Sequence, residues 1–329
     1  MALRVAVVGA GTWGTTVAAL ASLGNDTVLW SRRREVADSI ATRRTNDVYL
    51  PGVELPAELR ATPSLAEAVR GAEVVVMAVP SHGFRAVLAE AAAHVPAGIP
   101  VVSLAKGLEP GTRRRMTEVV ADVLPGHAAG ALTGPNLARE ILEGQPAAAV
   151  LAFADEEVAT ALQPVFHGPA FRVYTNADVV GCEIAGVVKN VIAIAAGMVE
   201  GMGFGDNTKA TVMTRGLAEL TRLGVALGGD PRTFAGLAGM GDLVATCSSP
   251  QSRNHRVGVE LGRGRPLVEI LAATPMIAEG VGSSPVVCQL AAEHGVDMPL
   301  SAQVRAVCAG EAGVADAVGA LLRRPPTSE

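Results

Sequence analysis

Aromatic residues are scarce in this sequence. They make up 3% of its 329 residues, which argues against a binding surface of stacked rings for bases or sugars. Charge is sparse as well, since charged residues are 18% of the chain and the formal net charge is −5. Without an excess of positive charge, we expect no binding of nucleic acid by bulk electrostatics. Any phosphate must therefore be bound by a local site.

Cysteine is also rare. The chain has four cysteines, and they show neither a CxxC spacing nor a metal-ligand pattern: Cys182, Cys247, Cys288 and Cys308. We therefore expect free thiols in a reducing cytoplasm, and no metal site.

Long apolar runs are missing, although the mean hydropathy of +0.34 is high. The best candidate for a membrane span covers residues 184–202, but Lys189 and Asn190 interrupt it and leave nine uncharged, largely apolar residues at 191–199. A spanning helix needs about 20. The apolar residues 5–8 run directly into glycines, which is unlike the core of a signal peptide. We expect neither a membrane span nor a signal peptide.

The first half of the chain alternates short β-rich runs with alanine-rich helical stretches. Runs that are apolar on both faces, separated by helical patterns, are typical of buried parallel strands in a doubly wound α/β sheet. The predicted strands lie at residues 3–8, 26–30, 73–79, 100–104, 129–132, 147–153 and 171–174.

The pattern changes after about residue 178. From residue 181 onward the periodicity is helical, with prolines between the helices and no convincing strand. The clearest predicted helices lie at residues 184–197, 211–227, 284–294 and 301–309. We therefore predict a Rossmann-like α/β domain at residues 1–180 and an all-helical substrate-binding domain at residues 181–329.

A glycine-rich motif, Gly-Ala-Gly-Thr-Trp-Gly, begins at Gly9, between the first predicted strand and a helix expected from about Thr15. Gly9 would allow a tight turn, Gly11 would let a pyrophosphate approach the backbone, and Gly14 would let helix and strand pack closely. The phosphates would then meet free N–H groups at the helix N-terminus. This context favours dinucleotide binding over a glycine-rich turn that holds no ligand.

The end of the second predicted strand discriminates between the two nicotinamide cofactors. NAD enzymes usually place Asp or Glu there, to bind the ribose 2′-hydroxyl. This chain has Ser31-Arg32-Arg33-Arg34-Glu35 instead, and an arginine fork suits a 2′-phosphate. We therefore favour NADP(H), bound by Arg32 and Arg33, over a solvated basic start to a helix. NAD(H) stays open as the alternative because Glu35 follows closely.

Polar residues also follow the later predicted strands, at the edge where such sheets bind ligands. His82 follows the third strand, but a loop histidine with no partner in view is more often a bystander. Lys106 follows the fourth strand, where it would suit an anionic substrate or the nicotinamide ribose. Gly134 and Asn136 follow the fifth and offer backbone N–H groups and an amide. Each of these could also belong to an ordinary turn.

Lys189 is the most informative residue of the second half, because it interrupts an apolar helical stretch. A buried lysine is costly unless it is paired or faces a cavity, and burial moves its pKa toward the range useful for acid–base catalysis. The alternative is a lysine that reaches the surface along a core helix. Asp242, on one helix face with Thr246, would keep the ammonium charged, or could simply cap a helix.

A cluster of hydrogen-bond donors follows at Ser252, Arg253 and Asn254. Arginine with serine and asparagine neighbours suits a phosphate, although an ordinary polar loop has the same composition.

Taken in order, these segments resemble the bacterial NAD(P)-dependent glycerol-3-phosphate dehydrogenases. The VKNVIAIA segment, followed by GDL and QSRN, is highly specific, whereas the glycine motif adds little. The likeness runs from about residue 7 to 300 through GAGTWGT, NDVYLPG, AVPSHGFR, SLAKGLE, TGPNLARE, GVVKNVIAIAAGM, TRGLAEL, GMGDLVATC, QSRNHRVG and the late Ala278-Glu279-Gly280.

The resemblance implies roles for individual residues, with Lys189 as the catalytic proton acceptor. On the chemistry of the residues, Asp242 would orient Lys189. Position 136 departs from the family in being Asn rather than Thr or Ser, and Val281 stands where an aromatic is common. Implied cofactor contacts are Thr12, Trp13, Arg32, Lys106, Ala138, Arg253, Ile277 and Glu279. Implied substrate contacts are Lys106, Gly134, Asn136, Lys189, Asp242, Ser252, Arg253 and Asn254.

The implied reaction is reversible hydride transfer between the nicotinamide and C2 of a three-carbon phosphate. Dihydroxyacetone phosphate would become sn-glycerol 3-phosphate, in the cytoplasm, for glycerophospholipid synthesis. The expected partner is this small phosphorylated substrate, and a homodimer is one candidate assembly. Two alternatives stay open: a reductase of another keto or hydroxy acid, and a redox sensor that binds NADP(H) without turnover.

Overall fold

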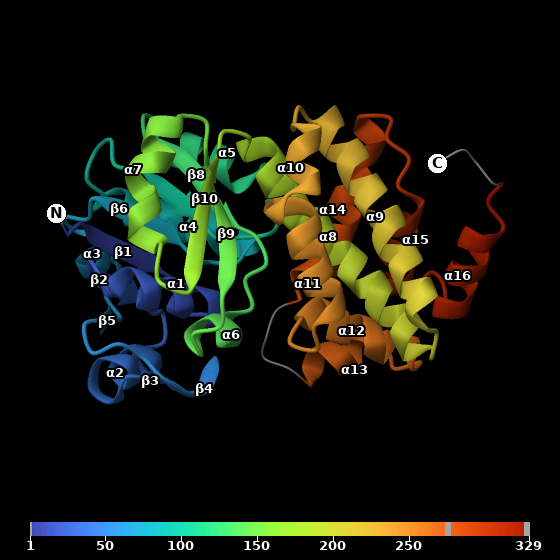
Figure 1. Ribbon diagram of the computed structural model, residues 1–329, viewed down its shortest axis with the longest axis horizontal. Coiled ribbons are helices and arrows are strands. Elements are labelled where there is room, and N and C mark those ends of the chain that lie inside the picture. The colour runs from blue at the N-terminus through green and yellow to red at the C-terminus, as the bar shows by residue number, and fades with distance from the viewer. Residues whose placement is uncertain (1, 274–277, 326–329) are drawn as a thin grey trace. The chain divides into compact units, whose positions relative to one another are not determined.

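The computed structural model describes residues 2–273 and 278–325 (Figure 1). The chain divides into two compact units, Met1–Glu183 and Ile184–Glu329. The division falls inside helix α8 (Val179–Gly201), so one continuous helix belongs to both units.

The first unit is built on an eight-stranded sheet with the order β10-β9-β8-β7-β6-β1-β2-β5. A separate antiparallel pair, β3 (Thr45–Asn46) and β4 (Leu50–Glu54), lies between β2 and β5 in the sequence. The sheet strands are β1 (Arg4–Val8), β2 (Asp26–Trp30), β5 (Arg60–Thr62), β6 (Val74–Met77), β7 (Val101–Ser103), β8 (Ala129–Thr133), β9 (Ala147–Phe153) and β10 (Phe171–Asn176). The helices are α1 (Thr12–Ser22), α2 (Arg34–Arg43), α3 (Leu65–Val69), α4 (Ser81–Ala92), α5 (Met116–Val123), α6 (Ala138–Leu142) and α7 (Glu156–Phe166).

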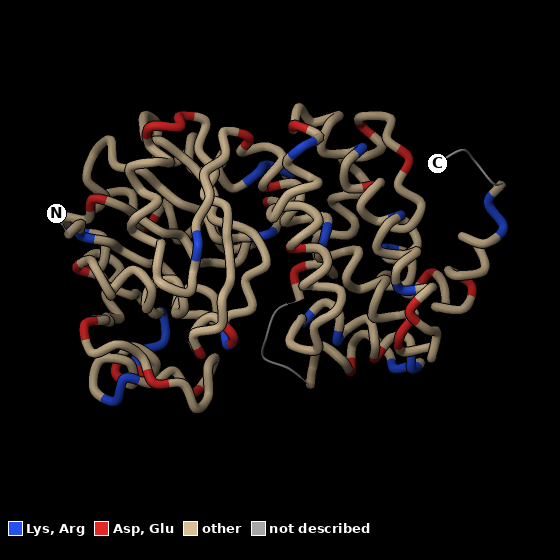
Figure 2. Tube along the Cα trace, in the orientation of Figure 1, with Lys and Arg blue, Asp and Glu red and all other residues tan. Residues whose placement is uncertain are grey.

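Helices cover both faces of this sheet, as the two-sided apolar strands predict (Figure 1). Alternate residues of β1 point to opposite faces. Val5 and Val7 join a core that includes Val17 of α1. Ala6 and Val8 join a second core with residues of α3, α4 and α5. The central strands β6 to β9 carry no charged residue, and Figure 2 shows them in tan.

One strand runs against the predicted direction. β9 is antiparallel to β8, whereas the other neighbouring pairs of the sheet are parallel. A parallel neighbour needs a crossover long enough to retrace the strand. The connection from β8 to β9 contains only the five-residue helix α6, which at about 1.5 Å per residue is much shorter than the seven-residue strand that it would have to retrace. The chain therefore turns back beside β8, and α7 then supplies the crossover that makes β10 parallel to β9.

Helix α1 begins at Thr12, earlier than the predicted start at about Thr15. Gly11 is its N-cap, and the amide of Thr15 already donates to the carbonyl of Gly11 over 2.9 Å. The turn is completed within the glycines themselves, so the helix N-terminus lies directly at the glycine motif.

The second unit is helical, and its described residues form no strand. Pro231 and Pro299 stand at helix starts, as expected, but Pro285 lies inside α14 rather than between helices. Besides α8 the elements are α9 (Asp206–Ala226), α10 (Pro231–Ala235), the π-helical turn η1 (Leu237–Gly241), α11 (Asp242–Ser248), α12 (Arg253–Gly262), α13 (Leu267–Ala272), α14 (Glu279–Glu293), α15 (Pro299–Cys308) and α16 (Val314–Leu322).

Helix α8 is the core helix of this unit. It has 23 residues and a hydropathy of 1.8, which by length and composition alone would let it cross a membrane, yet 89% of its most apolar window is buried inside the protein. Core helices of soluble proteins pass the same test.

Helices α8 and α12 cross at glycines. A Cβ at Gly197 would lie 2.1 Å from the carbonyl oxygen of His255, and one at Gly258 would lie 2.1 Å from that of Ile194. The two backbones therefore touch without side chains between them. This contact sets the distance between α8, which carries Lys189, and the start of α12.

Candidate active site

The glycine motif of the first unit has the geometry of a phosphate cradle. Gly9 adopts a φ of 121°, where a Cβ would meet the carbonyl oxygen of Ala78 at 2.7 Å. A Cβ at Gly14 would lie 2.0 Å from the carbonyl oxygen of Gly9. Gly11, by contrast, has open space around it, with no atom within 4 Å of a Cβ there. The predicted steric roles of Gly9 and Gly14 are confirmed, and the space at Gly11 fits a pyrophosphate on a helix N-terminus.

The β3–β4 region supports this motif from the side. Asn46 donates from its amide to the carbonyl of Ala10 over 3.0 Å and to the Thr15 hydroxyl over 2.8 Å. The Thr12 hydroxyl donates to the carbonyl of Tyr49 over 3.3 Å. Sequence reasoning missed Asn46 and Tyr49 as neighbours of the motif, although both belong to the NDVYLPG segment.

Arg32 and Arg33 are exposed directly after β2. Arg33 is the N-cap residue of α2, and its amide donates to the Ser31 hydroxyl over 3.2 Å. The Arg33 guanidinium lies over the Tyr49 ring, 5.9 Å from its centre, which is within the range of a cation–π contact. The two arginines thus keep their charges in solvent at the strand end where the adenine ribose of a dinucleotide lies in this fold.

Trp13 and Ala138 are the other predicted cofactor contacts of this unit. The indole of Trp13 packs edge-on against Phe171, with ring centres 6.2 Å apart. Its N–H is buried and has no hydrogen-bond partner among the described residues. Ala138 is the first residue of α6 and is buried. A buried donor without a partner is rare in proteins and is consistent with a polar ligand at this position.

Lys106 and the loop after β8 are brought together. The Lys106 ammonium donates to the carbonyl oxygen of Gly134 over 3.0 Å. Both polar atoms of the Asn136 amide, and the hydroxyl of Thr133, are buried without a partner in the part of the chain that the structure describes. Such atoms cost free energy unless something satisfies them. These unpartnered polar atoms make the end of β8 a candidate binding site for a polar molecule.

Lys189 is at the centre of the second unit's polar group. Its ammonium donates to Asp242 Oδ1 over 2.7 Å and to Thr246 Oγ1 over 2.6 Å. The side chains of Lys189 and Asp242 are only 6% and 2% exposed. The Thr246 hydroxyl donates in turn to the backbone carbonyl of Asp242 over 2.6 Å, so its oxygen is left to accept from the lysine. Thr246 was expected on one helix face with Asp242, but not among the site residues.

This arrangement answers the question that sequence analysis left open for Lys189. The side chain does not reach the surface; it ends in a buried ion pair. Removing one partner of such a pair costs about 3–5 kcal/mol, because it leaves an uncompensated charge. Asp242 begins α11, directly after the π-helical turn η1, a distortion that is frequent at functional sites. The pair fixes the position of an ammonium that could exchange a proton.

Ser252, Arg253 and Asn254 begin α12. The Ser252 hydroxyl is the N-cap and accepts from the amide of His255 over 3.3 Å. Arg253 is exposed. This places a guanidinium at the positive end of a helix dipole, where an anion is favoured.

Asn254 has a structural task in addition to its predicted one. Its amide donates to Asn190 Oδ1 over 2.9 Å, and its oxygen accepts from the amide of Gly280 over 2.9 Å. It thereby links α12 to α8 and α14. Asn190, the neighbour of Lys189, is a further residue of this group that sequence reasoning did not select.

Partial burial lowers the pKa of the Arg253 guanidinium, and the charge of Glu279, the first residue of α14, opposes that shift. Ile277, predicted beside it, lies outside the described residues. The predicted residues therefore form two groups. The glycine motif, the arginines after β2, Lys106 and the Gly134 loop belong to the first unit. The residues of α8, α11, α12 and α14 belong to the second.

Comparisons with known proteins cover nearly the whole chain. A family model for the N-terminus of NAD-dependent glycerol-3-phosphate dehydrogenase matches residues 4–159, and the corresponding C-terminal model matches residues 178–319. The chain is 57% identical over 323 residues to glycerol-3-phosphate dehydrogenase (NAD(P)+) 2 of Sphingopyxis alaskensis, covering 98% of this chain and 97% of that protein. It is 55% identical over 305 residues to the Streptomyces griseus enzyme of the same name, covering 92% and 91%.

Among solved structures, the crystal structure of glycerol-3-phosphate dehydrogenase from Coxiella burnetii is similar at 37% sequence identity, with a TM-score of 0.94. The match covers 98% of this chain and 99% of that one. The similarity therefore extends over both units.

Proposed function

Since the chain belongs to the NAD-dependent glycerol-3-phosphate dehydrogenase family, we propose that it reduces dihydroxyacetone phosphate reversibly to sn-glycerol 3-phosphate, with Lys189 as proton donor. The observation that carries this proposal is the buried pairing of Lys189 with Asp242 and Thr246. An ammonium held in this way by an otherwise apolar helix has a fixed position and a proton to give.

A reduced nicotinamide, when bound, would supply a hydride to C2 of the substrate. As the C2 carbonyl accepts the hydride, negative charge develops on its oxygen. Lys189 gives that oxygen a proton from Nζ, and takes it back in the reverse direction. The positive charge of the ammonium also stabilises the developing oxyanion. Asp242 and Thr246 act by holding Nζ in one place, since both accept hydrogen bonds from it.

Arg253 is assigned to the substrate phosphate. It is exposed at the first position of α12, where the guanidinium and the helix N-terminus both favour an anion. Ser252 and Asn254 flank it as further donors. Binding the phosphate, which does not react, positions C2 for the hydride.

The cofactor is assigned to the first unit. The open space beside Gly11 would hold its pyrophosphate, and the exposed Arg32 and Arg33 would bind a 2′-phosphate on the adenine ribose, so that NADP(H) is favoured and NAD(H) is the alternative. Lys106, Gly134 and Asn136 are assigned to the substrate, with Lys106 also touching the cofactor. The buried and unpartnered amide of Asn136 supports this assignment.

We also place the protein in the cytoplasm, where its four free cysteines would stay reduced. Its product, sn-glycerol 3-phosphate, would there enter glycerophospholipid synthesis.

A steady-state assay tests the proposed reaction. Oxidation of the reduced nicotinamide is followed by its absorbance, with dihydroxyacetone phosphate, unphosphorylated dihydroxyacetone and pyruvate as substrates. Only dihydroxyacetone phosphate should be turned over efficiently. Equal turnover of the unphosphorylated ketone would overturn the substrate class, and preferred turnover of pyruvate would favour the alternative keto-acid reductase.

A further inference from the structure

The segment between β7 and α5 carries Lys106 and is held at both ends. On one side the amide of Leu104 donates to the carbonyl of Met77 over 2.9 Å. Leu104 and Leu108 are buried, at 5% and 4% exposure. On the other side lies Glu109, three residues after Lys106. Glu109 is only 9% exposed. A buried carboxylate in a surface connection needs a reason to be there.

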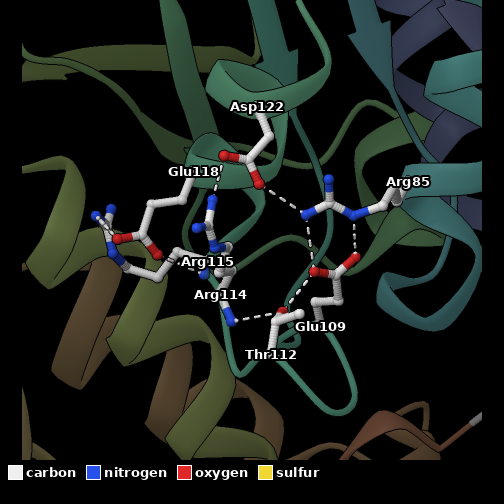
Figure 3. Close-up of polar contacts among 7 residues, drawn as sticks. All are labelled: Arg85, Glu109, Thr112, Arg114, Arg115, Glu118 and Asp122. Atoms are coloured by element: carbon white, nitrogen blue, oxygen red, sulfur yellow. Dashed lines mark hydrogen bonds and ion pairs between the residues drawn. The ribbon is translucent and has the colours of Figure 1, made fainter.

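Arg85 of α4 is the partner of that carboxylate (Figure 3). Its Nε lies 2.6 Å from Glu109 Oε1 and its Nη2 lies 2.9 Å from Oε2, which is a two-pronged contact. The Thr112 hydroxyl donates to the same carboxylate. These hydrogen bonds lower the pKa of Glu109, with the bond from Arg85 the largest cause, whereas burial opposes the shift. Two parallel charge-assisted bonds fix direction as well as distance.

The backbone from Glu109 to Arg114 forms a hydrogen-bonded turn. The amide of Glu109 donates to the carbonyl of Arg114 over 2.9 Å, and the amide of Arg113 donates to the carbonyl of Glu109 over 2.9 Å. The turn between them contains two residues of positive φ, Gly111 at 82° and Arg113 at 60°. The segment after Lys106 is therefore a compact turn, and Arg85 ties it to α4.

Arg85 also contacts a residue that is not part of this segment. Its Nη2 donates to Asp122 Oδ2 over 2.9 Å, and Asp122 accepts from Arg114 as well (Figure 3). Asp122 is on α5, and its side chain is 33% exposed. Loss of the Asp122 carboxylate would leave the two-pronged contact between Arg85 and Glu109 in place. The chain thus supplies a matched control.

We propose that Arg85 and Glu109 are a positioning pair for Lys106, and that they set its affinity for the substrate without touching the substrate. The inference rests on the proposed role of Lys106. The pair fixes the backbone three residues beyond Lys106, and β7 fixes it on the other side. Without the pair, the ammonium would lose its defined position beside the carbonyl of Gly134.

The test compares Arg85→Met, Lys106→Met and the double variant. A small misplacement of a binding group can lower catalytic efficiency by up to about 100-fold. Arg85→Met should therefore raise the KM for dihydroxyacetone phosphate on the order of 10- to 100-fold. Arg85→Lys, which keeps the charge and one prong, should recover part of the loss. Asp122→Asn should leave the KM unchanged. In the Lys106→Met background, Arg85→Met should raise the KM no further.

Three results would overturn parts of this account in distinguishable ways. If Lys106→Met leaves the KM unchanged, the proposed role of Lys106 is wrong, and the positioning role falls with it. If Lys106→Met raises the KM and Arg85→Met does not, only the positioning pair is wrong. If Arg85→Met raises the KM by the same factor in the parent and in the Lys106→Met variant, Arg85 has a merely structural role. Should Arg85→Met fail to fold, Glu109→Gln carries the same comparison, because it keeps the side-chain volume and removes the charge.

Discussion

Burying the Lys189 ammonium costs several kcal/mol, which the fold offsets with one carboxylate and one hydroxyl. At the scale of single residues, this free-energy cost is the main sign of function in the second unit. A well-packed apolar residue would stabilise α8 at least as well. The retained lysine therefore points to chemistry rather than to stability.

The first residue-scale prediction concerns Arg253. Arg253→Ala should raise the KM for dihydroxyacetone phosphate by roughly 10- to 100-fold, because a charge-assisted bond to the phosphate is worth about 1.5–3 kcal/mol. Arg256→Ala is the control, since Arg256 is exposed on the same helix. Steady-state kinetics on both variants measure the difference. Equal effects of the two substitutions would remove Arg253 from the phosphate site.

The second residue-scale prediction concerns cofactor choice. Replacing Arg32 and Arg33 together by Ala should weaken NADPH on the order of 10- to 100-fold and NADH far less, because only NADPH has a 2′-phosphate to pair with them. Arg34→Ala, at the exposed first position of α2, is the control. Titration of both cofactors into each variant decides the matter. If NADPH and NADH weaken equally, the arginines do not select the cofactor.

The charged residues of the candidate site could be predicted from the sequence, but most of their hydrogen-bond partners could not. Lys189 was recognisable because a charge in an apolar helix is costly, and Asp242 because a carboxylate would offset that cost. Asn190 and Tyr49 carry no such signal, and Thr246 was expected only to share a helix face with Asp242. Thr246 lies 57 positions from Lys189, so only the packing of α8 against α11 makes it a partner.

At the scale of elements, the crossing of α8 and α12 positions the site. Gly258→Ala would place a Cβ 2.1 Å from the backbone carbonyl of Ile194, and backbone atoms cannot move cheaply. We expect it to reduce the free energy of unfolding by about 1–3 kcal/mol, the usual cost of overpacking. It should also raise the KM for the substrate, because the start of α12 would shift away from Lys189.

Gly282→Ala is the matched control, since Gly282 lies in α14 with no atom within 4 Å of its Cβ position. Alanine favours a helix by up to about 1 kcal/mol over glycine, so this variant should be as stable as the parent or more so. Urea unfolding of both variants gives the comparison. A Gly258→Ala protein as stable as Gly282→Ala would show that the crossing is not tight.

The strands illustrate what an apolar pattern does and does not specify. Runs such as that of β9 are apolar on both faces, which predicts a buried strand correctly but is the same in either direction. The predicted strands gave the length of the connection before β9, but not that its helix α6 would be too short to retrace the strand and that β9 would be reversed. Likewise, the glycine motif predicted a turn before α1, but the turn is tighter than expected and α1 begins at Thr12.

At the scale of the whole molecule, the two units have different chemistry. The first has a glycine cradle, exposed arginines and unpartnered buried amide atoms, which suit a large polar cofactor. The second has the buried pair of Lys189 and Asp242, which suits proton transfer, and Arg253 at the start of a helix, which suits a small anion. The account therefore predicts that cofactor binding and turnover can be separated by a substitution in the second unit.

Lys189→Met tests that central claim most directly, with NADPH affinity measured by fluorescence titration and turnover of dihydroxyacetone phosphate measured in the same preparation. Methionine fills the volume of the buried side chain and has no proton to give. Turnover should fall by about 10²–10⁴-fold or more, since general acid catalysis and charge stabilisation are both lost, while NADPH affinity should stay unchanged. A variant that keeps about a tenth or more of the parent rate would contradict the account, because loss of a general acid costs far more than that.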